Sequence, residues 1–232
     1  MSQKKQYLTV IPARGGSKRL KQKNILELDG KPLISWTIEA AKSSKYLTNV
    51  VVSSDDDAIL ALAKENGVTA LQRPIHLASD TASTVDVLKH TLEIYSGYEY
   101  IVLLQTTSPL RDSKHIDEAI VLLEEKRADA VVSVCKTEHS PLWTNTLAQN
   151  MSMEGFMKKE LYNSRSQDLE EFYRLNGAIY ICKVEKFLEE ETLFLEKNIY
   201  AYVMQNDVSV DIDTRVDFLL CEALIKERKE RC

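Results

Sequence analysis

Short apolar runs alternate with segments of helical length along the first 134 residues, and this alternation restricts the chain to few folds. Runs rich in β-branched and aromatic residues predict strands over residues 7–13, 49–54, 69–72, 100–105 and 130–134. Helical spacing of apolar residues predicts helices over 33–41, 56–66, 84–95 and 115–125. Apolar strands separated by helices are typical of a mostly parallel sheet covered on both faces. We therefore expect a three-layer, Rossmann-like α/β fold.

The alternation stops after Val134. Residues 136–176 are polar and irregular, with a stretch that contains Met151, Met153 and Met157. An α/β pattern returns at 178–181 and 199–204, and a helix is predicted from about Thr214. We expect one domain over residues 1–232, with 136–176 as an inserted, protruding segment that serves dimerisation.

Composition excludes several function classes. The net charge is −5, from 30 Lys and Arg against 35 Asp and Glu, which disfavours sequence-independent binding of nucleic acid. No apolar run reaches the roughly 18 residues of a membrane span, and the first six residues lack the apolar core of a signal peptide. No C-x-x-C pair occurs among the four cysteines, which are Cys135, Cys182, Cys221 and Cys232. We expect a cytoplasmic protein.

The first segment that could carry chemistry is a glycine turn rich in cations, at residues 11–24. Gly15 and Gly16 would let backbone N–H groups approach phosphate oxygens, and Arg14 can engage two oxygens at once. The spacing matches neither a Walker A loop nor G-x-G-x-x-G, so a solvated basic turn is the alternative. Five cations lie within the segment: Arg14, Lys18, Arg19, Lys21 and Lys23.

A second segment places two carboxylates on one face of an extended run. Asp211 and Asp213 would share that face, with Ile212 buried opposite. Paired carboxylates suit Mg²⁺, which favours a few carboxylates together with substrate phosphates. The alternative is that Asp213 or Thr214 caps the next helix. For the acidic run at 55–57, charge at a helix N-terminus is the better explanation.

Two further segments carry polar groups at the expected edge of the sheet. Amide and hydroxyl groups in residues 105–111 suit a polyhydroxylated ligand or a base, although these residues alone favour an ordinary Ser-Pro turn that opens a helix. Arg165 and Arg174, near the Asn176-Gly177 turn, could direct charge at a carboxylate or phosphate. A surface ion pair with Asp168 or Glu171 is the alternative for these arginines.

Taken in order, these segments resemble the CMP-sialic acid synthetases, or acylneuraminate cytidylyltransferases, from Tyr7 to about Leu220. The anchors are I-P-A-R-G-G-S-K with K-N, R-P with L-A-S-D-T-A-S at 73–83, and L-L-Q-x-T-S-P-L-R at 103–111. Further anchors are R-x-Q-D with N-G-A-I-Y at 165–180, and D-I-D at 211–213. The resemblance implies a nucleotidyltransferase that transfers CMP from CTP to the C2 hydroxyl of a nine-carbon acidic sugar, with Mg²⁺ and as a homodimer.

The resemblance also implies roles for individual residues. The nucleotide-binding residues would be Arg14, Gly15, Ser17, Lys23, Asn24, Arg73 and Ser83. The sugar-binding residues would be Gln105, Thr107, Ser108, Arg174 and Asn176. Arg165, Lys23 and Asp211 would be catalytic, and Asp211 and Asp213 would hold the metal. A histidine metal site is disfavoured, and nothing identifies the general base beyond a metal-bound water or Asp211 itself.

Two positions depart from the family pattern, because Lys21 and Thr106 stand where proline is usual. Legionaminic acid enzymes fit the motifs equally well, and pseudaminic acid enzymes fit less well. An NAD(P)-dependent oxidoreductase and a non-catalytic sugar-nucleotide binding protein are the alternatives from other classes. The cytidylyltransferase interpretation requires the basic glycine turn and the paired acids to meet at one nucleotide.

Overall fold

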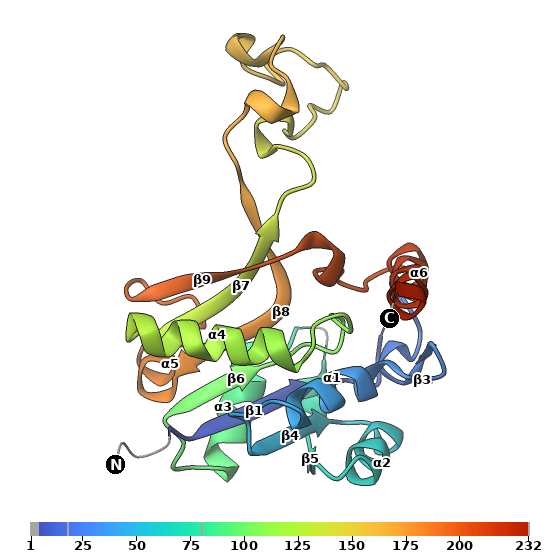
Figure 1. Ribbon diagram of the computed structural model, residues 1–232, viewed down its shortest axis with the longest axis vertical. Coiled ribbons are helices and arrows are strands. Elements are labelled where there is room, and N and C mark those ends of the chain that lie inside the picture. The colour runs from blue at the N-terminus through green and yellow to red at the C-terminus, as the bar shows by residue number, and fades with distance from the viewer. Residues whose placement is uncertain (1–4, 18, 80, 232) are drawn as a thin grey trace.

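A mixed sheet of seven strands forms the centre of the molecule in the part of the chain that the structure describes (Figure 1). The structure is a computed structural model that describes residues 5–17, 19–79 and 81–231. Residues 1–4, Lys18, Asp80 and Cys232, on which some of the expectations fall, lie outside the described residues.

The strands lie in the order β5-β4-β1-β6-β8-β7-β9. Only β8 runs antiparallel to its neighbours within the described sheet. The other pairs, β1 with β4, β1 with β6, β4 with β5 and β7 with β9, are parallel. The strand bounds are β1 Tyr7–Pro12, β4 Asn49–Ser54, β5 Thr69–Gln72, β6 Tyr100–Leu103, β7 Ala130–Lys136, β8 Tyr173–Lys183 and β9 Ile199–Met204. A separate short hairpin pairs β2 (Glu27–Leu28) with β3 (Lys31–Pro32).

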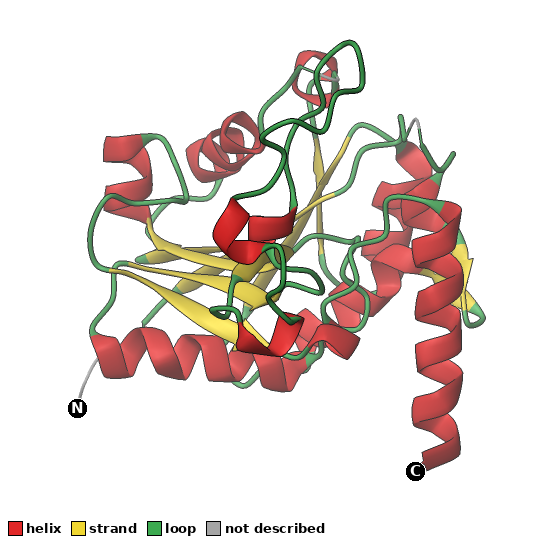
Figure 2. Ribbon diagram, turned by 90° about the horizontal axis from the view of Figure 1, so that it is seen from above, coloured by secondary structure: helices red, strands yellow, loops and turns green. Residues whose placement is uncertain are grey.

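Helices cover both faces of the sheet, and each face has its own apolar core (Figure 2). Side chains on strand β1 point alternately to the two faces of the sheet, so the strand contributes to both cores. Tyr7 and Ile11 belong to one core, and Leu8 and Val10 belong to the other. The first core also takes residues from α1 (Leu33–Lys42), α2 (Asp57–Glu65), α4 (Ser113–Lys126) and α6 (Arg215–Arg231). The second takes residues from α3 (Thr84–Ile94) and α5 (Val184–Glu190). The predicted three-layer α/β fold is confirmed.

Most predicted elements are present, and the main difference concerns β8. A strand was expected over 178–181, whereas β8 begins at Tyr173 and pairs with the end of β7. The residues that open β8 do alternate between apolar and polar, and the two apolar ones, Tyr173 and Leu175, are about half exposed. The Asn176-Gly177 pair that follows them is a typical turn signal, so a strand was expected only after it.

Residues 137–172 connect β7 to β8 and project away from the sheet (Figure 1). We call this segment the arm. Its regular structure consists of short 3-10 helices over Pro141–Trp143, Lys159–Leu161 and Ser166–Asp168. Leu147, Met151 and Met153 are exposed on it.

The cysteines and the helices bear on two expectations from composition. Cys135, Cys182 and Cys221 are buried free thiols. Among the residues described, no helix is both long and apolar enough to cross a bilayer.

Candidate active site

A polar cleft lies at the carboxyl ends of the parallel strands, where ligands bind in open α/β sheets. It consists of two adjoining cavities of about 370 and 440 Å³. Both cavities are lined by Pro12, Arg14, Thr106, Thr107 and Asp213. The first adds residues that include Arg73, Ser83, Gln105 and Asp211, and the second adds residues that include Ser17, Arg19, Lys23 and Asn24. A more apolar depression between α1 and α6 shares no lining residue with this cleft and contains none of the predicted site residues.

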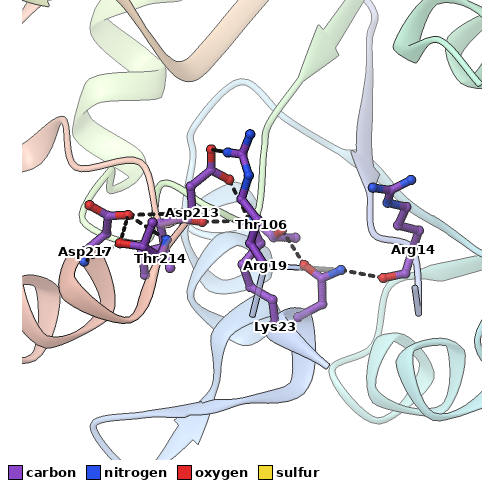
Figure 3. Close-up of polar contacts among 9 residues, drawn as sticks. Arg14, Arg19, Lys23, Thr106, Asp213, Thr214 and Asp217 are labelled. Carbon is purple, nitrogen blue, oxygen red and sulfur yellow. Dashed lines mark hydrogen bonds and ion pairs between the residues drawn. The ribbon is translucent and has the colours of Figure 1, made fainter. Parts of the chain in front are cut away.

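The basic glycine turn meets Asp213 in this cleft (Figure 3), and Asp211 lines the cavity that Arg14 also lines. The Lys23 Nζ atom donates to the Ile212 carbonyl oxygen at 2.6 Å and lies 3.1 Å from one Asp213 carboxylate oxygen. The Arg19 guanidinium lies 2.6 Å from the other Asp213 oxygen. The juxtaposition that the cytidylyltransferase interpretation requires is therefore confirmed.

Backbone contacts explain why the acidic segment lies beside β6. The Ile212 side chain is fully buried, as predicted, and its N–H donates to the Thr107 carbonyl oxygen at 2.8 Å. Thr214 caps α6 in a reciprocal pair, because its hydroxyl accepts from the Asp217 N–H at 3.4 Å and the Asp217 carboxylate accepts from the Thr214 N–H at 2.6 Å. The capping role proposed as an alternative thus falls to Thr214, which leaves the Asp213 carboxylate turned toward the cations.

Asn24 joins the two rims of the cleft. Its amide nitrogen donates to the Arg14 carbonyl oxygen at 2.8 Å, and its amide oxygen accepts from the Thr106 hydroxyl at 2.6 Å (Figure 3). Both Asn24 and Thr106 are buried. A proline at position 106 would have no hydroxyl to donate, so this link depends on the departure from the family pattern. Asn24 lines the cavity but acts here as a brace for the loop.

Gly15 serves close packing rather than an open phosphate nest. Its N–H donates to the Asp55 carboxylate at 3.1 Å. A Cβ atom at Gly15 would lie only 2.6 Å from a carboxylate oxygen of Asp56, so no larger residue fits. Asp56 in turn caps α2 by accepting from the N–H groups of Ala58 and Ile59, as expected for this acidic run. The contact with Asp55 was missed, because 40 residues separate the partners in sequence.

Arg73 is buried at the floor of the first cavity. It donates to the backbone oxygens of Ser53 and Leu77, while its Nε atom is buried with no hydrogen-bond partner. Burial lowers the pKa of this guanidinium, and the nearby Asp55 carboxylate partly offsets that effect. Ser83, at the rim, caps α3 in a reciprocal pair with Asp86. The cavity thus contains a cation whose hydrogen bonding is incomplete.

The two predicted metal ligands have different environments. Burial raises the pKa of Asp211, the Asp213 carboxylate raises it further, and a hydrogen bond from Thr107 opposes the shift. Asp213 is instead neutralised by Lys23 and Arg19. No cluster of three or more His, Cys, Asp or Glu side chains suited to a metal is found in the described part of the chain.

The predicted sugar-binding residues divide into two groups. Gln105 and Thr107 line the first cavity. Ser108 and Asn176 are almost fully buried and line neither cavity, so neither can touch a ligand in the cleft as the structure stands. Side-chain direction at irregular strand ends cannot be derived from spacing alone.

Neither of the two predicted arginines from the later segment lines the cleft. Arg174 forms a two-pronged ion pair with Glu138, at 2.7 and 3.1 Å, which raises the pKa of Arg174. Its partner is therefore neither Asp168 nor Glu171. Arg165 is exposed on the arm and lines neither cavity. Arg19 was counted among the cations of the turn but given no role, whereas the structure places it in the cleft beside Asp213.

Comparisons with known proteins agree with this geometry. Residues 8–229 match the cytidylyltransferase family. The chain is 38% identical over 225 residues to an N-acylneuraminate cytidylyltransferase of Escherichia coli, a match that covers 97% of this chain and 53% of that protein. It is 33% identical to the pseudaminic acid cytidylyltransferase of Campylobacter jejuni and 34% identical to the CMP-N,N'-diacetyllegionaminic acid synthase of Legionella pneumophila. Each of these two matches covers 96% of this chain and 97% of the relative. The chain belongs to the cytidylyltransferase family.

The chain spans about half the length of the N-acylneuraminate cytidylyltransferases that it matches. Among solved structures, it resembles CMP:2-keto-3-deoxy-manno-octonic acid synthetase in complex with CTP, with a TM-score of 0.73. That match has 17% sequence identity and covers 96% of this chain and 99% of that one, and it concerns the fold.

Proposed function

We propose that this protein transfers CMP from CTP to the C2 hydroxyl of a nine-carbon acidic sugar, N-acetylneuraminic acid or a close relative, and releases pyrophosphate. The observation that carries the proposal is the meeting of Lys23 and Arg19 with Asp213 in the cleft that Asp211 and Arg73 also line. Cations for a triphosphate and carboxylates for its metal ion thus share one space. Family membership favours this reaction over an NAD(P)-dependent oxidation.

Arg14, Ser17, Lys23, Arg73 and Ser83 would hold the nucleotide, since all five line the cleft. The cations would neutralise the phosphates, Arg73 through the part of its side chain that lines the first cavity. Asn24 and Gly15 would contribute by keeping the loop in place, given the partners that both already have.

The donor set fits Mg²⁺, which takes one or two carboxylates together with substrate phosphates. Asp211 and Asp213 would be its ligands, and the bound ion would polarise the reacting phosphate. Lys23 and Arg19 both pair with Asp213. A triphosphate that attracted these cations would release the carboxylate for the metal, so nucleotide and metal should strengthen each other's binding.

In the reaction the C2 hydroxyl oxygen bonds to the α-phosphorus while the bond from that phosphorus to the pyrophosphate oxygen breaks in line. Positioning and charge stabilisation supply most of the rate in such transfers. Lys23 would steady the charge on the departing pyrophosphate. Asp211 lines the same cavity as Gln105, so we assign the hydroxyl proton to its carboxylate.

Gln105 and Thr107 are the residues that we assign to the sugar. Sialic acid is the favoured substrate, and pseudaminic and legionaminic acid are candidates because relatives of similar identity are enzymes named for those sugars. Ser108 and Asn176 are not assigned to the sugar, because both are buried and line neither cavity.

We also propose that the protein is a homodimer held by the arm, supported by the exposed Leu147, Met151 and Met153. Arg165 lies on the arm and lines neither cavity, so a catalytic role requires the arm to reach a cleft of its own or of a second copy. Substitution of the three apolar residues by aspartate should convert a dimer to a monomer in analytical ultracentrifugation. An unchanged sedimentation coefficient would contradict the role of the arm.

The central experiment measures pyrophosphate release with CTP and Mg²⁺ across sialic, legionaminic, pseudaminic and eight-carbon acids. Release that requires both CTP and a nine-carbon acid supports the proposal. Binding of CTP in calorimetry with no release from any acid would instead indicate a non-catalytic sugar-nucleotide binding protein. A nicotinamide-dependent absorbance change would revive the oxidoreductase alternative.

A further inference from the structure

Strand β8 contains an irregularity beside the cleft. Val132 of β7 pairs with Tyr180 of β8, and Val134 pairs with Leu175, so residues 176–179 lie opposite Ser133 alone. Such bulges bend a strand and re-aim its residues, and they occur next to active sites. The bulge contains the Asn176-Gly177 turn that sequence analysis associated with the sugar.

A buried polar cluster holds this bulge. The Ser133 hydroxyl accepts from the Ile179 N–H at 2.8 Å and lies 2.6 Å from the Asn176 amide oxygen, to which it donates. The Asn176 amide nitrogen donates to the Ser209 hydroxyl at 3.0 Å. Asn176 is 1% exposed and both serines are fully buried. Ser209 lies two residues before Asp211, so the cluster connects β7 and the bulge to the acidic segment.

Gly177 lies at the centre of the bulge in a left-handed conformation, with φ of 73°. A Cβ atom at this position would lie 2.6 Å from the Gln105 side-chain oxygen and 3.8 Å from an Asp211 carboxylate oxygen. The first distance is too short for any side chain, whereas the second is an ordinary contact. The absence of a side chain at Gly177 is thus what lets the Gln105 carboxamide lie where it does.

We propose that Gly177 is a positioning residue for Gln105, kept in its left-handed conformation by the Ser133–Asn176–Ser209 cluster. The inference rests on the proposed function in one respect, since Gln105 is the residue assigned there to the sugar. This assigns a structural role to two residues of the N-G-A-I-Y motif. Asn176 holds the bulge through its hydrogen bonds with Ser133 and Ser209, and Gly177 leaves room for the Gln105 carboxamide.

The position of the clash predicts which substrate is affected. The atom that a new Cβ meets is the far end of a flexible side chain, so Gln105 would move while the backbone stays folded. The three atoms nearest to a Cβ at position 177 belong to Gln105 and Asp211, and none of them to the cations Arg14, Lys23 and Arg73. The nucleotide half of the cleft should therefore be unaffected.

The test is Gly177→Ala, with Gly97→Ala as the matched control. Gly97 also has a positive φ, of 90°, but a Cβ atom there meets nothing within 4 Å, so it reports backbone strain without a clash. We expect Gly177→Ala to raise the KM for the acidic sugar about tenfold or more and to leave the Kd of CTP within twofold. Misplacement of a positioning group by about 1 Å can cost this much. Gly97→Ala should change neither constant.

The double variant Gln105→Ala/Gly177→Ala separates a positioning role from a general loss of structure. If Gly177 acts through Gln105, the double variant has the same sugar KM as Gln105→Ala alone. The proposal would be overturned if the increase in sugar KM in the double variant equalled the product of the two single increases. An unchanged sugar KM in Gly177→Ala would also overturn it. Should Gly177→Ala fail to fold, Ser133→Ala loosens the same bulge and must show the same sugar-selective change.

A crystal structure of Gly177→Ala tests the packing without reference to the reaction. We expect the Gln105 carboxamide to be displaced from its position beside residue 177, with Lys23 and Asp213 unmoved. An undisplaced Gln105 would refute the inference even if the enzyme is active. Conversely, absence of pyrophosphate release from the unmodified protein would refute the proposed function and leave this structural prediction to stand or fall on the displacement.

Discussion

The cleft and the arm are built on different physical principles. In the cleft, side chains from distant parts of the sequence are held by buried hydrogen bonds, such as those of Asn24 with Arg14 and Thr106. The arm consists of irregular chain and single-turn helices, and the side-chain hydrogen bonds within it are mostly exposed, such as that from Asn145 to the Phe156 carbonyl oxygen. A preorganised site needs the first kind of support. The comparison shows that the cleft is held by buried contacts between distant segments, whereas the arm lacks them.

The largest effect should come from the acidic pair. Asp211→Asn removes a proposed metal ligand and proton acceptor, and we expect turnover to fall at least 10²–10³-fold, the range for loss of one preorganised catalytic group. Pyrophosphate release measures the loss, and circular dichroism should show an unchanged fold. Turnover near that of the unmodified protein would remove Asp211 from the mechanism.

The second prediction tests whether the arm contributes to catalysis in the cleft. Arg165→Ala should lower turnover about 10²-fold if the arm completes the active site, while the Kd of CTP remains unchanged because Arg165 lines neither cavity. Lys158→Ala, an exposed cation on the same arm, is the control for a general change of charge. Equal turnover in both variants would show that the arm takes no part in the chemistry.

A smaller effect should appear in stability. Thr106→Val leaves the buried Asn24 amide oxygen without its donor, which should lower the free energy of unfolding by about 1–3 kcal/mol. Denaturant titration measures the change. The control is Thr91→Val, since the Thr91 hydroxyl bonds only to the Val87 carbonyl of its own helix. Only the variant at position 106 should also weaken CTP binding, because only there does the brace to Arg14 depend on the hydroxyl.

The smallest effect concerns pH. The pKa of Asp211 is raised mainly by burial, so activity should fall as the pH drops through values above the ordinary aspartate pKa of about 3.9. Thr107→Val removes the hydrogen bond that opposes this shift, and the acidic limb of kcat/KM should move to higher pH, by less than about one unit. A limb that moves to lower pH would show that Asp211 is not the group that titrates.

Sequence patterns predicted the fold well wherever burial imposes a period. The strand over 49–54 has the expected bounds because its continuous apolar run is buried, and the strands over 69–72 and 199–204 also have them although most of their residues are partly or fully exposed. The start of β8 was missed because Asn176-Gly177 is a typical turn signal, whereas the structure takes this pair into a bulge of the strand. Apolar pattern and strand propensity together thus identify a strand in a single sequence, even at the edge of a sheet.

The site was predictable as a set of loops but not as a set of contacts. Residues near the ends of parallel strands must share one edge, which correctly grouped Arg14, Arg73 and Gln105. The same reasoning could not distinguish Gln105, which faces the cleft, from Ser108, which is buried three residues later. Side-chain direction in a turn depends on local dihedral angles and neighbours that spacing does not encode.

Residue order and chemical type already implied an α/β layer structure, a basic turn near the start and a carboxylate pair near the end, because these properties are local. The pairing of Lys23 with Asp213, the partnership of Gly15 with Asp55 and the gap at Gly177 arise between segments that are far apart along the chain. Such contacts depend on how the strands order themselves in the sheet and on where the bulge in β8 falls. Packing of the whole molecule therefore selects which of many suitable side chains face one another.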